Sequence, residues 1–151
     1  MCQMATRILP VDNIIELLGG PHVLGKDIRS HLALIPLLRK GLPYAALEAL
    51  SCTIDVSINA VARSLRLPRR TLARRKDQNR LDTHASERVL RLAAVAARAI
   101  MNFSSVQHGR TWLIAENRGL GGVAPITLLD TDVGARAAEE VLIRMYPSYD
   151  I

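Results

Sequence analysis

Aromatic residues are scarce in this 151-residue chain: they make up 3% of it, as one Trp, one Phe and three Tyr. Glycine and proline are also sparse, with nine and seven copies. A β-sandwich or barrel needs many β-branched and aromatic residues and many tight turns, so this composition argues against one and favours helix. With 49% hydrophobic and 23% charged residues, the chain is not of the intrinsically disordered type. We therefore expect an all-α protein with one ordinary core or two small ones.

Long apolar runs are missing as well. The longest uncharged runs, 99–109 and 119–129, are well short of the roughly 20 apolar residues that span a membrane. The first residues contain no apolar segment of a signal peptide, because Arg7, Pro10 and Asp12 interrupt them. We therefore expect a cytoplasmic protein with no membrane partner.

No group of residues has the arrangement of a catalytic or metal site. Without an export signal, Cys2 and Cys52 are expected to be reduced thiols. They share no metal-ligand spacing with the histidines, which are His22, His31, His84 and His108. The glycine-rich segment 118–122 follows a predicted helix and lacks the Gly-Lys-Ser/Thr of a phosphate-binding loop. The adjacent Glu139 and Glu140 point about 100° apart on a helix, which argues against a paired-carboxylate site. We expect no enzyme activity and no cofactor; a small-ligand or enzymatic role of the glycine-rich loop is the weaker alternative.

The positive charge is concentrated in one short segment. The net charge of the chain is +6, with 20 basic and 14 acidic residues. Eight of the basic residues lie within 60–81, where Asp77 is the one acidic residue, and the flanking segments are close to neutral. Such a block is typical of a protein that binds a polyanion. A solvated helix face is the alternative, and the elements around the block favour nucleic acid.

The basic block overlaps two short predicted helices. Residues 58–65 place their apolar side chains on one stripe, after possible N-caps at 55–57, and Pro68 opens a second helix over 69–80. Two short helices joined by a tight break, the second far more basic, predict a helix-turn-helix at about 57–80. The second helix of that motif enters the major groove of DNA. The candidate DNA-binding residues are Arg66, Arg69, Arg70, Thr71, Arg74, Arg75 and Lys76.

The arginines of this set divide by their position. Side chains in the first turns of a recognition helix reach base edges most easily; these are Arg69, Arg70 and Arg74. The remaining cations are expected to contact phosphates; these are Arg66, Arg75 and Lys76.

Helical periodicity predicts most of the remaining architecture. Further helices are expected over 10–18, 27–39, 44–50, 86–103, 106–116 and 132–145, with a helical turn over 125–129. Ser86 is the expected N-cap of the long helix, and Thr131 that of the last one. The long helix is apolar on two flanks, so we expect it to be the central helix of a small domain, to meet another chain, or both. Its one largely polar strip consists of Arg88, Arg91, Val95, Arg98 and Asn102. A boundary near 81–85 predicts a DNA-binding domain over 1–81 and a second domain over 82–151.

Seven segments of this chain recur in the same order in one family. They are RKGLP at 39–43, LPRRTLARR at 67–75, SERVLRLA at 86–93, TWL at 111–113, NRGLGG at 117–122, PITLLDT at 125–131 and GAR at 134–136. Each segment alone is weakly specific, whereas their order and spacing together are fairly specific. Over about 19–145, the chain resembles the Xre/MbcA/ParS-type antitoxins of bacterial RES–Xre toxin–antitoxin pairs.

The resemblance implies a helical DNA-binding domain followed by a helical toxin-binding domain. The implied protein partner is a RES-domain toxin, similar to ADP-ribosyltransferases and active on NAD, whose active-site entrance the antitoxin covers. The second implied partner is double-stranded operator DNA, through which a homodimer or larger complex represses its own operon. The alternative is a stand-alone helix-turn-helix regulator whose C-terminal half only dimerises. An antitoxin gene, unlike that alternative, is expected beside a RES-type toxin gene.

The second half of the chain is close to neutral, so toxin recognition is expected to depend on packing and hydrogen bonds. Family members often end in a short tail after a glycine, whereas this chain ends in YPSYDI. Two of the five aromatic residues lie in that tail, and tyrosine is frequent among interface hot spots; an ordinary frayed terminus is the alternative. The expected toxin-binding residues are Trp112, Asn117, Arg118, Arg144, Met145, Tyr146, Tyr149 and Ile151.

Overall fold

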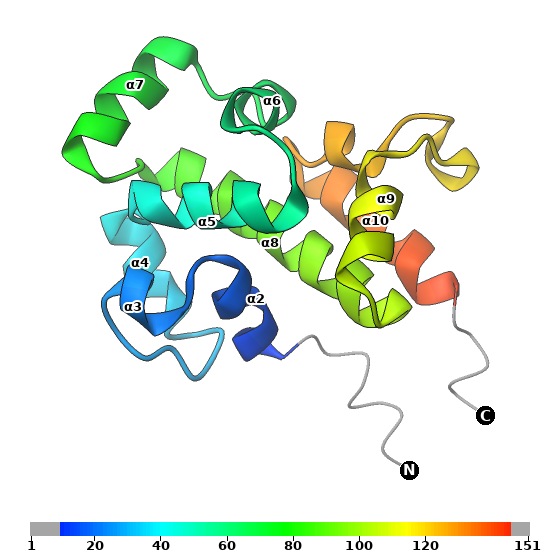
Figure 1. Ribbon diagram of the computed structural model, residues 1–151, viewed down its shortest axis with the longest axis horizontal. Coiled ribbons are helices and arrows are strands. Elements are labelled where there is room, and N and C mark those ends of the chain that lie inside the picture. Colours follow the sequence, from blue (N-terminus) through cyan, green and yellow to red (C-terminus); the bar gives the residue numbers. More distant parts are fainter. Residues whose placement is uncertain (1–9, 146–151) are drawn as a thin grey trace.

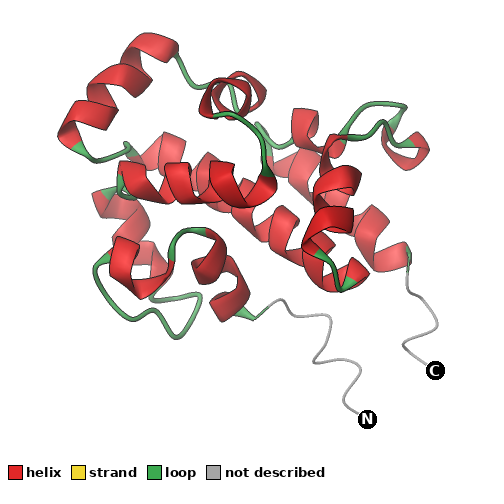
Figure 2. Ribbon diagram, in the orientation of Figure 1, coloured by secondary structure: helices red, strands yellow, loops and turns green. Residues whose placement is uncertain are grey.

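The computed structural model describes residues 10–145, and these residues form helices joined by loops and turns, with no strand among them (Figures 1 and 2). The expected all-α fold is confirmed. In chain order the elements are α2 (Val11–Leu17), α3 (Gly20–Leu24), α4 (Leu34–Lys40), α5 (Tyr44–Ile54), α6 (Ile58–Ser64), α7 (Arg69–Gln78), α8 (Thr83–Phe103), α9 (Val106–Ile114), the 3₁₀ turns η1 (Arg118–Leu120) and η2 (Pro125–Leu128), and α10 (Asp132–Arg144).

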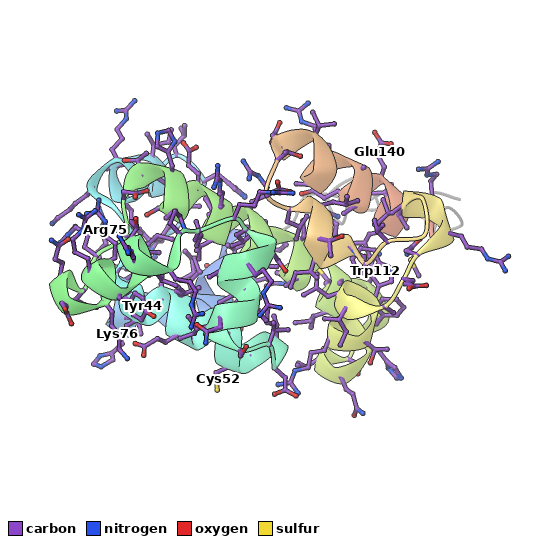
Figure 3. All side chains as sticks on the ribbon, turned by 90° about the horizontal axis from the view of Figure 1, so that it is seen from above. Tyr44, Cys52, Arg75, Lys76, Trp112 and Glu140 are labelled. Carbon is purple, nitrogen blue, oxygen red and sulfur yellow. The ribbon has the colours of Figure 1, made fainter. Side chains whose placement is uncertain are left out.

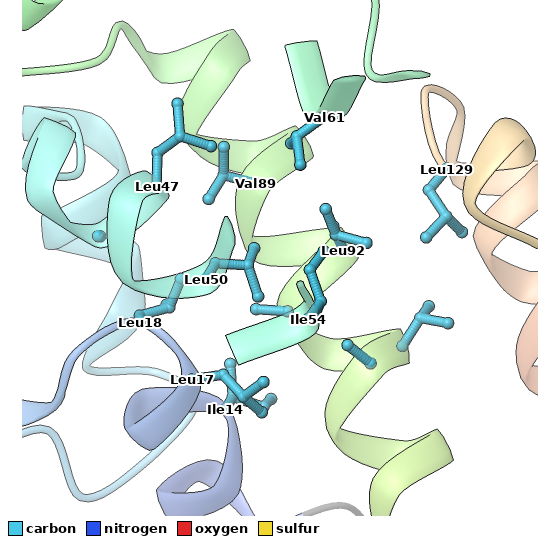
Figure 4. Close-up of a cluster of buried hydrophobic side chains, with 14 of the residues drawn as sticks. Ile14, Leu17, Leu18, Leu47, Leu50, Ile54, Val61, Val89, Leu92 and Leu129 are labelled. Carbon is cyan, nitrogen blue, oxygen red and sulfur yellow. The ribbon is translucent and has the colours of Figure 1, made fainter. Parts of the chain in front are cut away.

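The long helix α8 is the centre of the molecule. Helices α2, α4 and α5 pack on it from the N-terminal half, and α9 and α10 pack on it from the C-terminal half. Val89, Leu92 and Val95 on α8 are fully buried. Figure 4 shows Val89 and Leu92 among side chains from α2, α5 and α6, with Leu129 from the C-terminal half beyond them. The expected central position of this helix is confirmed, and one hydrophobic core runs through both halves. Burial on both flanks is confirmed only in part, because Leu90, Ala94 and Met101 on the second flank are half-buried.

Two glycines allow close contacts that support this packing. Gly41 has a φ of 103°, which favours glycine, and a Cβ there would lie 2.0 Å from the carbonyl oxygen of Leu81. Next to it, the Leu81 amide donates to the Leu42 carbonyl at 2.8 Å. Where α8 and α9 meet, a Cβ on Gly109 would lie 2.9 Å from the Cα of Ile100. The turn before α5 is therefore pinned to the segment that precedes α8.

The helix expected over 27–39 is wrong in its first half. The chain is irregular until α4 begins at Leu34, and Leu32 is 75% exposed. Proline lacks the N–H that a helix interior needs, but it fits a first turn, where the amides have no helical partner. Pro36 therefore lies in the first turn of a short helix and not in the middle of a long one.

The expected N-cap of the long helix is also wrong. The side chain of Asp82 caps α8 by accepting from the Ala85 amide at 2.8 Å. Ser86 is fully buried inside the helix, where its Oγ accepts from the Leu42 amide at 2.8 Å. The hydroxyl thus pairs a buried backbone donor from a distant segment, which local sequence does not reveal.

The helix boundaries otherwise follow the sequence closely. α5 continues to Ile54, past its expected end, and the short helix α3 was not expected. Thr131 caps α10 as predicted, because its Oγ1 accepts from the Gly134 amide at 3.0 Å. Over the described part of the chain, no single helix is both long and apolar enough to cross a membrane. The pair α5 and α6 reaches that length and hydropathy only together, with a 99° bend between the two helices.

Candidate nucleic-acid and partner interfaces

The predicted helix-turn-helix is formed by α6 and α7. Ser57 caps α6, and its Oγ accepts from the Ala60 amide at 3.2 Å. The chain then reverses through Arg66, which has a left-handed φ of 55°. The Leu67 amide donates back to the Ala62 carbonyl at 2.8 Å, and Pro68 precedes the first turn of α7. This tight turn sets the two helices at an angle, which is the local geometry of the motif.

Helix α7 lies at one edge of the molecule (Figure 1). Leu72 is its one buried residue, so a single side chain provides most of its anchorage. Four exposed cations of α7 have side chains without a hydrogen-bond or ion-pair partner among residues 10–145; they are Arg69, Arg70, Arg74 and Lys76. Thr71 is half-buried beside Leu72. The exposed surface of α7 is therefore a cationic strip, available to an anionic partner.

Two of the residues predicted to contact phosphates pair with acidic residues of the chain itself. The Arg66 Nε donates to Asp130 Oδ2 at 2.9 Å, and the Arg66 side chain is 79% exposed. Arg75 is only 27% exposed, with its Nη2 3.7 Å from Asp82 Oδ2 and its Nη1 donating to Gln78 Oε1 at 3.3 Å. Arg75 is thus turned toward the start of α8, whereas Lys76 next to it is exposed.

The polar strip of α8 faces other segments of the protein. Arg88 Nη1 donates to the carbonyls of Leu65 and Arg66 at 3.1 and 3.2 Å, and Arg91 Nη1 donates to the Leu129 carbonyl at 3.1 Å. Sequence reasoning did not identify these contacts. The one available signal was a polar strip on a helix that is otherwise apolar. The two arginines tie the helix-turn-helix and the segment before α10 to the central helix.

The glycine-rich segment after α9 forms a small closed loop. The Asn117 amide donates to the Val123 carbonyl at 3.1 Å, and the Gly122 amide donates to the Asn117 carbonyl at 2.9 Å. Asn117 Oδ1 accepts from the Gly119 amide at 2.8 Å, and Arg118 is exposed. The loop therefore presents an arginine on a backbone that is held by its own hydrogen bonds.

This loop packs on the last helix. A Cβ built on Gly119 would lie 3.1 Å from Val141 Cγ2 on α10, and Leu120 packs against the core. One helical turn after Val141 come Arg144 and Met145, both exposed. Apolar side chains at least 40% exposed lie in the loop, at the end of α9 and along α10 or directly after it: Ile114, Val123, Val133, Ile143 and Met145. The structure thus brings the predicted loop and α10 residues into one region.

The remaining predicted toxin-binding residues are Trp112 and three residues of the chain end. Trp112 is 8% exposed, and its indole Nε1 is buried without a hydrogen-bond partner among residues 10–145. Tyr146, Tyr149 and Ile151 lie outside the described residues. Figure 3 shows Trp112 and Glu140 at one end of the molecule and Arg75 and Lys76 at the other. Among the residues described, no three His, Cys, Asp or Glu side chains are grouped as metal ligands would be.

Comparisons with known proteins match both regions. The family model of the antitoxin Xre-like helix-turn-helix domain matches residues 33–94, which include α6 and α7. The model of the antitoxin Xre/MbcA/ParS C-terminal toxin-binding domain matches residues 97–146, which include the glycine-rich loop and α10. The chain is similar to Antitoxin Xre of Pseudomonas putida, with 27% identity over 109 residues that cover 72% of this chain and 69% of the relative. Because an Xre-like helix-turn-helix domain is followed by an Xre/MbcA/ParS toxin-binding domain, the chain belongs to the Xre-type antitoxins.

Proposed function

We propose that this antitoxin neutralises a RES-domain toxin by covering its active-site entrance and represses its own operon by binding operator DNA through α7. The observation that carries the proposal is the separation of two surfaces. The cationic strip of α7 lies at one end of the molecule, and the loop and α10 lie at the other (Figures 1 and 3). DNA and toxin can therefore be held at the same time. Operator binding and toxin capture both take place in the cytoplasm, where the operon lies.

The DNA-binding role is supported by the state of the α7 cations. Base edges in the major groove are read by side chains that project from the start of the recognition helix. Arg69, Arg70 and Arg74 are exposed and have no intrachain partner among the described residues, so no ion pair must break before they contact DNA. Arg66 and Arg75, in contrast, contact acidic residues before DNA arrives. We assign the first three to base edges and Lys76 to a phosphate.

The toxin-binding role is supported by the surface of the C-terminal half. Exposed apolar side chains beside one positioned arginine are typical of an interface whose affinity comes from packing around an anchor. Arg118 on the closed loop and Arg144 near the end of α10 provide the charged groups. Trp112 is buried, so we infer that it packs in the core of the C-terminal half instead of contacting the toxin. The RES identity of the toxin rests on the ordered motifs of the sequence, and we infer that the catalytic chemistry belongs to the toxin.

The test is co-expression of the antitoxin with the toxin encoded beside it. Removal of residues 146–151 is expected to abolish protection and to leave DNA binding intact. The converse control replaces Arg69, Arg70 and Arg74 by alanine. This variant is expected to lose DNA binding and to keep protection against the toxin. Full protection by the shortened chain would assign the toxin contact to the segment 112–122, and Arg118→Ala then becomes the decisive variant.

Operator binding also calls for two copies of the chain, and we propose a homodimer. Helix-turn-helix proteins bind half-sites about one DNA turn apart, one from each subunit. Along the less buried flank of α8 runs a groove of about 670 Å³, and Leu34, Leu90, Ala94 and Asp132 are among the residues that line it. Its apolar lining residues make this groove the proposed contact between subunits.

Two substitutions on α8 separate dimerisation from folding. Ala97 is 2% exposed, so Ala97→Glu places a carboxyl group in the core without a partner and is expected to cost several kcal/mol of stability. Ala94 is only half-buried in the groove, so Ala94→Glu is expected to fold and to remain monomeric. Light scattering on both variants and on the unmodified chain is the measurement. A dimer that persists in Ala94→Glu would exclude this groove as the interface.

A further inference from the structure

The ion pair between Arg66 and Asp130 joins the two matched domains. Arg66 belongs to the helix-turn-helix match and Asp130 to the toxin-binding match. The Arg66 Nε donates to Asp130 Oδ2 at 2.9 Å, and the side chains are 79% and 18% exposed. The guanidinium is thus open to solvent on one side, while the carboxylate that holds it is largely covered.

Both partners are held in place by their surroundings. Asp130 lies between the fully buried Leu129 and Thr131, the N-cap of α10. The Leu129 carbonyl accepts from Arg91 at 3.1 Å, which ties this segment to α8. On the other side, Arg88 donates to the Arg66 carbonyl at 3.2 Å and so fixes the turn in its left-handed conformation. The carboxylate is therefore a prepositioned partner for Arg66.

Arg66 lies in the turn that leads into α7, next to the proposed DNA contacts. Residues flanking a recognition helix commonly contact phosphates, and a phosphate is the same kind of partner for a guanidinium as a carboxylate. Arg66 cannot direct its Nε to Asp130 and to a phosphate at the same time. A phosphate that binds the Nε edge of Arg66, in the bidentate geometry that guanidinium favours, must therefore displace Asp130, whereas the Nη groups stay free among residues 10–145.

Resting on the DNA-binding role proposed above, we propose that Asp130 is an intramolecular competitor of DNA phosphate for Arg66. A residue of the toxin-binding domain thereby lowers the DNA affinity of the helix-turn-helix. The effect is independent of base sequence, because a phosphate contact carries no direct sequence information. Asp130 contacts Arg66 and not DNA, so it is a positioning residue.

The experiment measures binding of the full chain to a short random-sequence duplex by fluorescence anisotropy, between about 50 and about 200 mM salt. Asp130→Asn is expected to bind more tightly and to steepen the log–log salt slope by about 0.9, the value for one more phosphate contact. Its advantage over the unmodified chain therefore shrinks about threefold across that salt range. In the Arg66→Ala background, Asp130→Asn is expected to change neither affinity nor slope.

Asp132→Asn is the matched control. Asp132 lies two residues further along, carries the same charge and pairs with Arg136 at 2.9 Å instead of Arg66. If Asp130→Asn behaves like Asp132→Asn, or keeps its effect without Arg66, the gain is long-range charge alone and the proposal is wrong. Thermal unfolding checks every variant, and Asp130→Ser replaces Asp130→Asn if the latter is unfolded. If the unmodified chain shows no salt-dependent binding to the duplex, the DNA-binding role itself is wrong. If the unmodified chain binds DNA and Asp130→Asn changes neither affinity nor salt slope, only the proposed competition of Asp130 with phosphate is wrong.

Discussion

The arginines of α7 and those of α8 look alike in the sequence and differ in the fold. On α7, the side chains of Arg69, Arg70 and Arg74 are exposed and contact no acceptor in the described part of the chain. On α8, Arg88 and Arg91 donate to backbone carbonyls of the helix-turn-helix and of the segment before α10. One group is available for a partner, and the other holds the protein together.

The position of each helix explains this difference. Leu72 is the one buried residue of α7, and the helix lies at the edge of the molecule. Arg69, Arg70 and Arg74 are therefore exposed, while Arg75 alone of its arginines pairs with Asp82 before α8. α8 is surrounded by helices of both halves, so its half-buried Arg88 and Arg91 lie within hydrogen-bond distance of backbone carbonyls on neighbouring segments. Basic character in a sequence therefore indicates a nucleic-acid interface only on an element that packing leaves exposed.

The largest expected effect is on DNA binding by α7. Replacing Arg69, Arg70 and Arg74 by alanine removes three proposed base contacts, each typically worth about 1–3 kcal/mol of discrimination. We expect operator affinity to fall by at least about 100-fold, or roughly 3 kcal/mol, with the unfolding midpoint unchanged. Anisotropy titration with the DNA upstream of the gene measures this loss.

A control with the same change in charge sharpens that result. Arg29, Arg39 and Arg136 are exposed arginines outside α7, and replacing all three removes an equal charge. This variant is expected to weaken binding to all sequences slightly and to keep the preference for the operator. Equal losses in the two triple variants would mean that α7 contributes only general charge.

The second expected effect is on stability and concerns α8. Arg91→Ala leaves the Leu129 carbonyl without its donor, and hydrogen bonds to charged groups contribute about 1.5–3 kcal/mol. We expect a loss of that size in the free energy of unfolding by urea. Arg74→Ala, on exposed α7, is expected to stay within about 0.5 kcal/mol of the parent. A larger loss of stability for Arg74→Ala than for Arg91→Ala would contradict the inference that the α8 arginines stabilise the fold and the exposed α7 arginines do not.

The smallest expected effect distinguishes two neighbours on α7. Lys76 is exposed, so Lys76→Ala is expected to reduce the log–log salt slope of DNA binding by about 0.9, the value for one phosphate. Arg75 is held by Asp82 and Gln78, so Arg75→Ala is expected to leave the slope unchanged and to lower stability by about 1 kcal/mol. The slope and the urea midpoint, measured for both variants, test this contrast.

Much of the fold could be predicted because its signals are local. The periodicity of α8, the caps at Ser57 and Thr131 and the break before Pro68 depend on residues within about one helical turn. The error at 27–39 has the same local origin, because the apolar spacing continues through Pro36, whereas a proline without its N–H fits the first turn of a helix and not its middle.

Partners of individual side chains were beyond the sequence. The hydroxyl of Ser86 was expected at a helix end and instead accepts from the amide of Leu42, which is 44 residues away along the chain. Asp130, which pairs with Arg66, carried no signal at all in the sequence. A side chain meets such a partner only after distant segments have packed.

The sequence by itself determined the helical class, the place of the helix-turn-helix and the concentration of positive charge on α7, because composition, capping and periodicity act over a few residues. Only the tertiary structure decided which cations remain exposed. It turned Arg75 toward α8, paired Arg66 with Asp130 and directed Arg88 and Arg91 to carbonyls, because packing around α8 brings these groups within hydrogen-bond distance. An ion pair or hydrogen bond between remote segments follows from where the core places them, and the core forms from the whole chain.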